Sequence, residues 1–89
     1  MIDKTKKQLA NTLDLPKELL LDYPLTSFIG NEELMIQNHK GIIEYTSEVI
    51  RVKTKIGPLK IEGKHLYINK MSPETLIITG IIRLLMFME

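Results

Sequence analysis

Cysteine is absent from this chain of 89 residues, and neither sign of charge dominates it. Without cysteine there is no disulfide framework, no thiol nucleophile and no thiolate metal site. The chain has twelve Lys and Arg residues and eleven Asp and Glu residues, so the formal net charge is +1. This balance argues against a dominant electrostatic field for nucleic acid or for an anionic membrane, and leaves room only for a local basic patch.

The chain also lacks a hydrophobic run long enough to cross a membrane as a helix. Its most apolar stretch, residues 76–88, is interrupted by Thr79, Gly80 and Arg83, and it is shorter than the roughly 20 residues that a spanning helix needs. The N-terminus is basic but has no apolar core of a secretory signal. We therefore expect a cytoplasmic protein without a transmembrane segment of its own.

Groups that carry catalysis are scarce. His39 and His65 are the only histidines, and two histidines in loops, with dispersed carboxylates, do not predict a metal site. We expect His39 to be a turn residue whose imidazole bonds a local carbonyl. Glu32 and Glu33 are neighbours, so on a strand they point to opposite faces and cannot act together as acid and base. No glycine-rich loop opens a helix, so the sequence predicts neither an enzyme nor a cofactor.

The hydrophobic pattern divides the chain into two parts. Residues 3–13 and 16–21 have helical spacing, with Pro16 at a first helical position. After Pro24 the period changes to about two and stays there. We therefore predict a helical segment over residues 1–24 and a small β domain over residues 25–89.

The triplet Leu-x-Ile occurs three times in the second half, at Leu59–Ile61, Leu66–Ile68 and Leu76–Ile78. Alternation places both apolar side chains of a triplet on one face of a strand. The gaps between strands are too short for crossover helices, so we expect antiparallel neighbours. With the apolar runs elsewhere the prediction is eight short strands, over residues 25–29, 33–37, 42–46, 49–54, 59–61, 66–68, 76–78 and 81–88.

These strands predict a mainly β fold: a short N-terminal helical segment followed by a small sandwich, roll or partly closed barrel. A β-solenoid is the alternative, although the triplets are not evenly spaced. Turns are expected where residues tolerate a left-handed backbone. They are Gly30, Asn31, Asn38, Gly41, Gly57, Gly63 and Gly80.

Two surfaces are candidates for binding. The first is the apolar C-terminal end, where near-continuous hydrophobicity suggests that both faces are covered or that another chain covers one; it comprises Leu84, Leu85, Met86, Phe87 and Met88. The second is a basic face formed by Arg51, Lys53 and Lys60, which is how a small RNA-binding barrel would bind. Glu48 and Glu62 interleave with these charges, so cross-strand charge pairing is the favoured interpretation and nucleic acid is not the expected partner.

Several segments together resemble the YabP/YqfC family of sporulation proteins. The resemblance covers about residues 13–82 and is carried by LDLPKELLLDYP, IGNEELMIQNHKGIIEYT, VIRVKT and GPLKIEGKHLYINKMSPETLIITGII. It implies a small cytoplasmic protein without enzymatic activity, made in the mother cell of an endospore-forming bacterium. It also implies a membrane-protein partner similar to YqfD, through which the chain would reach a membrane around the forespore.

The resulting hypothesis is a non-enzymatic adaptor or scaffold that assembles with itself, with a membrane protein, or with both. A domain this small is near the lower limit for a self-sufficient core, so assembly into a homo-oligomer would help it. A small RNA-binding barrel remains the alternative function.

Overall fold

A single antiparallel β-sheet forms the part of the chain that the computed structural model describes, residues 22–88. The order across the sheet is β1-β2-β6-β5-β4-β3. The strands are β1 (Leu25–Ile29), β2 (Glu33–Gln37), β3 (Ile42–Tyr45), β4 (Val49–Val52), β5 (Leu59–Met71) and β6 (Thr75–Phe87). The prediction of a mainly β, antiparallel fold is confirmed, and pairing that is antiparallel throughout replaces the solenoid alternative.

The two helices predicted over residues 3–13 and 16–21 lie outside the described residues, so the boundary between residues 24 and 25 stays a prediction. No helix occurs within residues 22–88.

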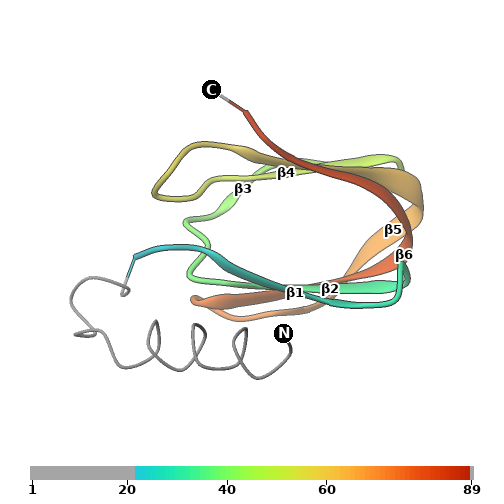
Figure 1. Cartoon of the computed structure of the whole chain (residues 1–89), viewed down its shortest axis with the longest axis horizontal. Coiled ribbons are helices and arrows are strands. Elements are labelled where there is room, and N and C mark those ends of the chain that lie inside the picture. Colours follow the sequence, from blue (N-terminus) through green and yellow to red (C-terminus); the bar gives the residue numbers. More distant parts are fainter. Residues whose placement is uncertain (1–21, 89) are drawn as a thin grey trace, which may run out of the picture.

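The two long strands, β5 and β6, connect two layers that face each other (Figure 1). The first part of β5, Leu59–Glu62, pairs with β4, whereas the first part of β6, Thr75–Thr79, pairs with β2. Each long strand therefore has its outer neighbour along only part of its length. One layer consists of β3, β4, the start of β5 and the end of β6, and the other of β1, β2, the start of β6 and the end of β5.

The structure has six strands where the sequence predicted eight, because two predicted pairs of strands are each continuous. The triplets at residues 59–61 and 66–68 both belong to β5, and the runs at residues 76–78 and 81–88 both belong to β6. Irregular pairing between β5 and β6, at Glu62/Gly63 and again at Lys64/Tyr67, accompanies the bend.

The turns predicted at Gly63 and Gly80 are wrong, because both glycines lie inside these long strands. They are needed there for close approach of the backbones. A Cβ on Gly63 would collide with the carbonyl oxygen of Ile81, and one on Gly80 would lie 2.6 Å from that of His65. Gly80 also has a φ of 144°, which side chains rarely adopt. Glycine here marks a bend with bulges and not the end of a strand.

The other predicted turn residues lie between strands. Gly30 and Asn31 are in the β1–β2 turn, Asn38 and Gly41 in the β2–β3 connection and Gly57 in the β4–β5 loop. Of these, Gly30, Asn38, Gly41 and Gly57 have positive φ angles.

The core fills the space between the two layers. Alternate residues of β2, β4, β5 and β6 point inward and are buried, and each fully buried aliphatic side chain stabilises the fold by about 1.5–3 kcal/mol. The buried hydrophobic residues are Leu34, Ile36, Ile50, Val52, Leu59, Ile61, Leu66, Leu76, Ile78 and Ile82.

Candidate functional site

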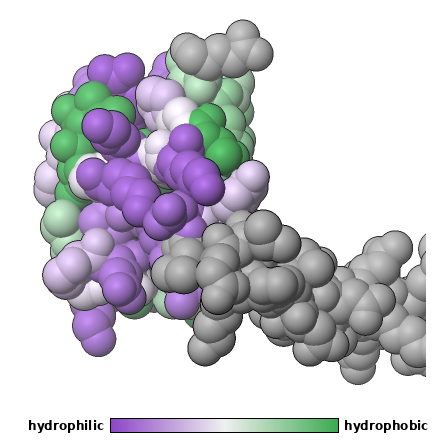
Figure 2. Space-filling view, turned by 90° about the vertical axis from the view of Figure 1, so that its left-hand side faces the viewer, coloured by the Kyte–Doolittle hydropathy of each residue, from purple (hydrophilic) through white to green (hydrophobic). Residues whose placement is uncertain are grey.

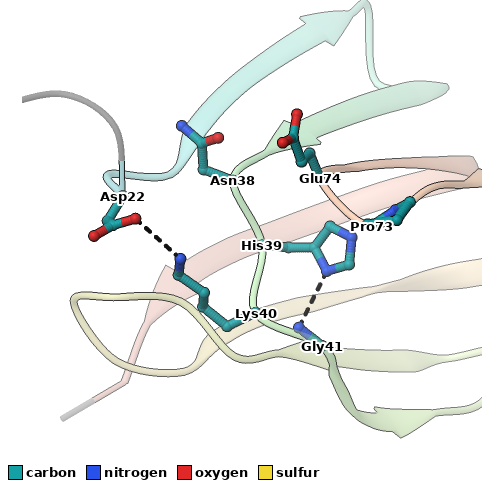
Figure 3. A pocket seen from close by; sticks show the side chains of 7 residues that line it. All are labelled: Asp22, Asn38, His39, Lys40, Gly41, Pro73 and Glu74. Atoms are coloured by element: carbon teal, nitrogen blue, oxygen red, sulfur yellow. Dashed lines mark hydrogen bonds and ion pairs between the residues drawn. The ribbon is translucent and has the colours of Figure 1, made fainter. Parts of the chain in front are cut away.

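The connection between β2 and β3 crosses from one layer to the other and lines a shallow pocket of about 420 Å³ (Figure 3). The residues around it come from this connection, from the β5–β6 turn and from the segment before β1. They are Asp22, Asn38, His39, Lys40, Gly41, Pro73 and Glu74. Hydrophilic side chains cover most of the end of the molecule that carries the β2–β3 connection and the β5–β6 turn (Figure 2).

His39 is the one ionisable residue of this pocket that is buried, with 5% of its surface exposed. The backbone N–H of Gly41 donates to its Nδ1 at 3.1 Å, and its Nε2 lies 2.9 Å from the carbonyl oxygen of Ser72. Because Nδ1 accepts a hydrogen bond, the proton is on Nε2, which donates to Ser72. Both ring nitrogens are thus occupied within the protein, and neither is left to serve as a base or a metal ligand.

The predicted partner of His39 was a local carbonyl, and here the structure differs from the prediction. The accepting carbonyl belongs to Ser72, 33 residues further along the chain. Turn chemistry at residues 38–41 gives no sign of this, because the β5–β6 turn reaches His39 only once the layers have packed.

Other polar groups of the pocket are also hydrogen-bonded or ion-paired within the protein. Lys40 Nζ lies 3.2 Å from Asp22 Oδ1 in an exposed ion pair. The backbone N–H of Asn38 donates to the carbonyl oxygen of Glu74 at 2.7 Å, and its side-chain amide donates to that of Tyr23 at 2.9 Å. The pocket therefore offers no set of free groups that converge on one point, as catalysis would need.

Residues 22–88 contain no cluster of three or more His, Cys, Asp or Glu side chains able to hold a metal ion. Four carboxylates outside the pocket are dispersed: Glu32 lies in the β1–β2 turn, Glu33 in β2, Glu44 in β3 and Glu48 before β4. His65 is exposed in β5, with a φ of 55°.

The predicted basic face is largely compensated by carboxylates. Arg51 of β4 and Lys60 of β5 are direct cross-strand neighbours on an outer face. Arg51 Nε lies 2.8 Å from Glu44 Oε1, and Lys60 Nζ lies 2.8 Å from Glu62 Oε2. Lys53, just after β4, is exposed. Two of the three candidate cations thus sit beside an anion, which weakens the field available to a nucleic acid backbone.

The aromatic residues that a nucleic-acid surface would use are not arranged as a stacking platform. The phenol oxygen of Tyr45 accepts a hydrogen bond of 3.0 Å from the backbone N–H of Ile68. This contact joins β3 of one layer to the outer edge of β5 in the other. Tyr67 is exposed on β5. Tyr45 therefore closes one side of the sandwich, and its ring is held in that role.

The apolar C-terminal end forms the second half of β6, and its side chains divide between the two faces. Leu84 and Met86 pair with Glu62 and Lys60, whose side chains form an ion pair on the outer face. Leu85 and Phe87 pair instead with Ile61 and Leu59 of the core.

Neither face of this segment is fully covered by the described part of the chain. Leu84 is 37% exposed, Met86 43% and Phe87 44%, whereas Leu85 packs against the core. Within residues 22–88 this end of β6 is thus an apolar surface, and its covering by another chain stays a prediction. Met88 follows it and is half-buried.

Comparison with known proteins gives a match to the profile of the YabP family over residues 26–89. The chain belongs to the YabP family. The match includes almost all of β1, all of the other strands, the pocket of His39 except Asp22, and the apolar end of β6. This YabP-family chain is also 26% identical, over 87 residues, to the uncharacterised protein YqfC of Bacillus subtilis (strain 168). That alignment covers 98% of the chain and 94% of YqfC.

The resemblance inferred from the sequence motifs is thereby confirmed at the level of the family. No solved structure matches this YabP-family chain. Within the part of it described by the structure, no helix is long and apolar enough to cross a membrane.

Proposed function

We propose that this YabP-family chain is a non-enzymatic interaction module that acts as an adaptor or scaffold during sporulation. The observation that carries the proposal is the apolar second half of β6, which is exposed at the side of a small sandwich. Exposed apolar surface next to unpaired backbone groups is the usual chemistry of a protein contact through strand addition. The sporulation role comes from the family resemblance that the motifs set out.

Catalysis has less support than interaction. In the pocket of Figure 3 the histidine, the lysine and the asparagine are each bonded to a protein group. A reaction would need some of these groups to be free and aimed at one point.

RNA binding, the alternative function, gains no support from the geometry either. Arg51 and Lys60 are each ion-paired, and Tyr45 is engaged by β5. Phosphate contacts by these cations would have to replace existing carboxylate contacts. We therefore do not propose it as a second function.

The partners in this proposal are a second copy of the chain and a membrane protein similar to YqfD. In this view the chain lies in the cytoplasm of the mother cell and reaches a membrane only through that partner. The family resemblance supports the membrane partner, and the apolar strand supplies a surface of the right kind.

The role is tested by deleting the gene in its own host. We expect fewer heat-resistant spores and normal vegetative growth, because the family resemblance implies a function limited to sporulation. Expression of the intact chain should restore the spore count. A catalytic alternative is tested by complementation with His39→Gln, which keeps a polar side chain but no imidazole. An unchanged spore count after deletion would contradict the proposal.

A further inference from the structure

The edges of the two layers are not equally protected. At β3 the pairing with β4 is irregular between Ile42 and Glu44. The outer edge of β5 is capped by the Tyr45 hydroxyl at Ile68, and Lys64 and Lys70 lie along it at irregular positions. β1 has only five residues and directly follows Pro24. Short strands, bulges, lysines and prolines are the devices with which proteins prevent edges from pairing.

Between Leu84 and Phe87 the second half of β6 carries no lysine, no proline and no bulge. In the described part of the chain, the pairing of β6 with β2 is confined to Thr75–Thr79, and beyond it the backbone N–H groups of Gly80 and Ile82 bond the β1–β2 turn. From Leu84 onward β6 pairs with β5 alone. Among the strands of residues 22–88, the other side of this segment has no partner and is an edge.

Hydrogen-bond alternation identifies which backbone groups point out from this edge. The N–H of Met88 donates to the carbonyl oxygen of Pro58 at 2.7 Å, toward β5. In an antiparallel ladder the direction alternates residue by residue, so Leu84 and Met86 also bond β5. The N–H and C=O groups of Leu85 and Phe87 therefore point away from β5, toward the open side.

The side chains on the outer face change character at this strand. Two rows of cross-strand neighbours run across the layer and end at β6. One row consists of Glu44, Arg51, Lys60 and Met86, and the other of Val49, Glu62 and Leu84. The ion pairs of this face thus lie on β3, β4 and β5, whereas the β6 edge carries the apolar residues. A protein that protects its edges places charge at the edge, so this arrangement is suited to an edge that is paired.

We propose that the second half of β6 pairs antiparallel with the same segment of a second copy, with Met86 on the two-fold axis. The proposal deepens the proposed function by naming the surface through which the module assembles. In this register Leu85 lies opposite Phe87 of the second copy, and Phe87 opposite its Leu85. All the outward N–H and C=O groups of these residues then find partners across the axis.

This register matches the edge to itself in side chains as well as in backbone. Met86 lies beside Met86 of the second copy on the outer face, and Leu84 lies beside its Met88. Leu85 and Phe87 meet on the inner face, where they continue the core. Every cross-strand pair is apolar, and no like charges oppose each other. The layer becomes continuous through both copies, in the order β3-β4-β5-β6-β6-β5-β4-β3, and the interface is isologous.

Cysteine cross-linking tests the register, because the chain has no cysteine of its own. In Met86→Cys the two introduced residues lie opposite each other at a Cα separation of about 4.5 Å, which a disulfide can bridge. In Leu84→Cys they lie four residues out of register, about 14 Å apart, which is too far. Ile43→Cys places a thiol of similar exposure on the β3 edge.

We expect mild oxidation to cross-link most of the Met86→Cys variant and little of the other two. Equal cross-linking of Met86→Cys and Leu84→Cys, or preferential cross-linking of Ile43→Cys, would overturn the proposal.

Sedimentation of the otherwise unaltered chain tests the association itself. We expect a concentration-dependent dimer that persists in high salt, since its contacts are apolar and backbone hydrogen bonds. Met86→Lys places two like charges on the axis and should weaken the dimer about tenfold or more. Ile43→Lys, an equal change on another edge, should leave the dimer unchanged. A monomer at every concentration, or a dimer that Met86→Lys does not weaken, would overturn the proposal.

The dimer and the sporulation role can fail separately. If Met86→Lys is monomeric but still restores spores, the interface is real and the adaptor role does not use it. If the chain is a monomer but its deletion lowers the spore count, the self-pairing is wrong and the role in sporulation stands.

Discussion

His39 connects the two layers where the β2–β3 connection lies against the β5–β6 turn. Its imidazole accepts from the backbone N–H of Gly41 and donates to the carbonyl oxygen of Ser72, so it fixes the β2–β3 connection against the β5–β6 turn. It is buried, and its removal would leave both backbone groups without their partner. Buried unsatisfied groups are more harmful to stability than a lost contact alone.

We therefore predict that His39→Ala lowers the free energy of unfolding by about 1–3 kcal/mol. Urea denaturation followed by circular dichroism measures the change. His65→Asn is the control, because His65 is exposed and its positive φ is one that asparagine tolerates; its effect should stay within about 0.5 kcal/mol. Equal effects of the two substitutions would contradict the role assigned to His39.

The tautomer of His39 is a separate prediction. The geometry requires hydrogen on Nε2 and a lone pair on Nδ1. Long-range nitrogen–proton NMR of the imidazole should show hydrogen on Nε2 of His39 and none on its Nδ1. An Nδ1–H signal for His39 would contradict the arrangement.

Turn chemistry predicted the positions of Asn38 and Gly41 in a connection, because their tolerance of positive φ is a local property. It did not predict the burial of His39. That burial depends on Ser72, whose position follows from how the long strands bend, and no spacing in the sequence encodes it.

The bend in β5 and β6 is the decisive feature among the elements. It turns one sheet into two facing layers, and it occurs where Gly63 and Gly80 let the two backbones approach. Any side chain at Gly63 meets the carbonyl of Ile81, which is part of the neighbouring strand and cannot rotate away. The bend therefore depends on the absence of a side chain at Gly63 and at Gly80.

We predict that Gly63→Ala lowers the free energy of unfolding by about 3 kcal/mol or more, because the strands must separate to admit the methyl group. Chemical denaturation gives the magnitude, and loss of soluble protein is its extreme form. In the control Gly30→Ala, the new Cβ has nothing within 4 Å, so only the positive φ opposes it and the loss should be about 1–2 kcal/mol. A mild Gly63→Ala would mean that the bend tolerates a wider spacing.

Period-two alternation predicted the strands of residues 25–29 and 33–37 with their correct ends. It predicted two strands in place of β5 and two in place of β6, because the sequence does not distinguish a glycine that ends a strand from one at which a strand bends. Bulges added to the error, because the extra residues interrupt the alternation much as a turn does. Only the pairing partner, which lies far along the chain, distinguishes the two cases.

For the whole molecule, the bend also has a consequence for assembly. By sending the second half of β6 away from β2, it leaves that half with only one neighbour among the described strands. The apolar C-terminal run could be predicted as a contact surface from the sequence. Which of its residues point outward could not, because the bulge between Glu62 and Gly63 shifts the register of Leu84–Phe87 against β5.

Amide hydrogen exchange should reveal this edge residue by residue. The N–H groups of Leu84 and Met86 face β5, so we predict slow exchange at every protein concentration. Those of Leu85 and Phe87 face the open side, so they should exchange quickly in dilute protein and slow down as the second copy pairs with them. In Met86→Lys they should stay fast over the same concentration range. Uniform protection along residues 84–87, independent of concentration, would contradict the self-pairing, because an unpaired edge protects only every second amide.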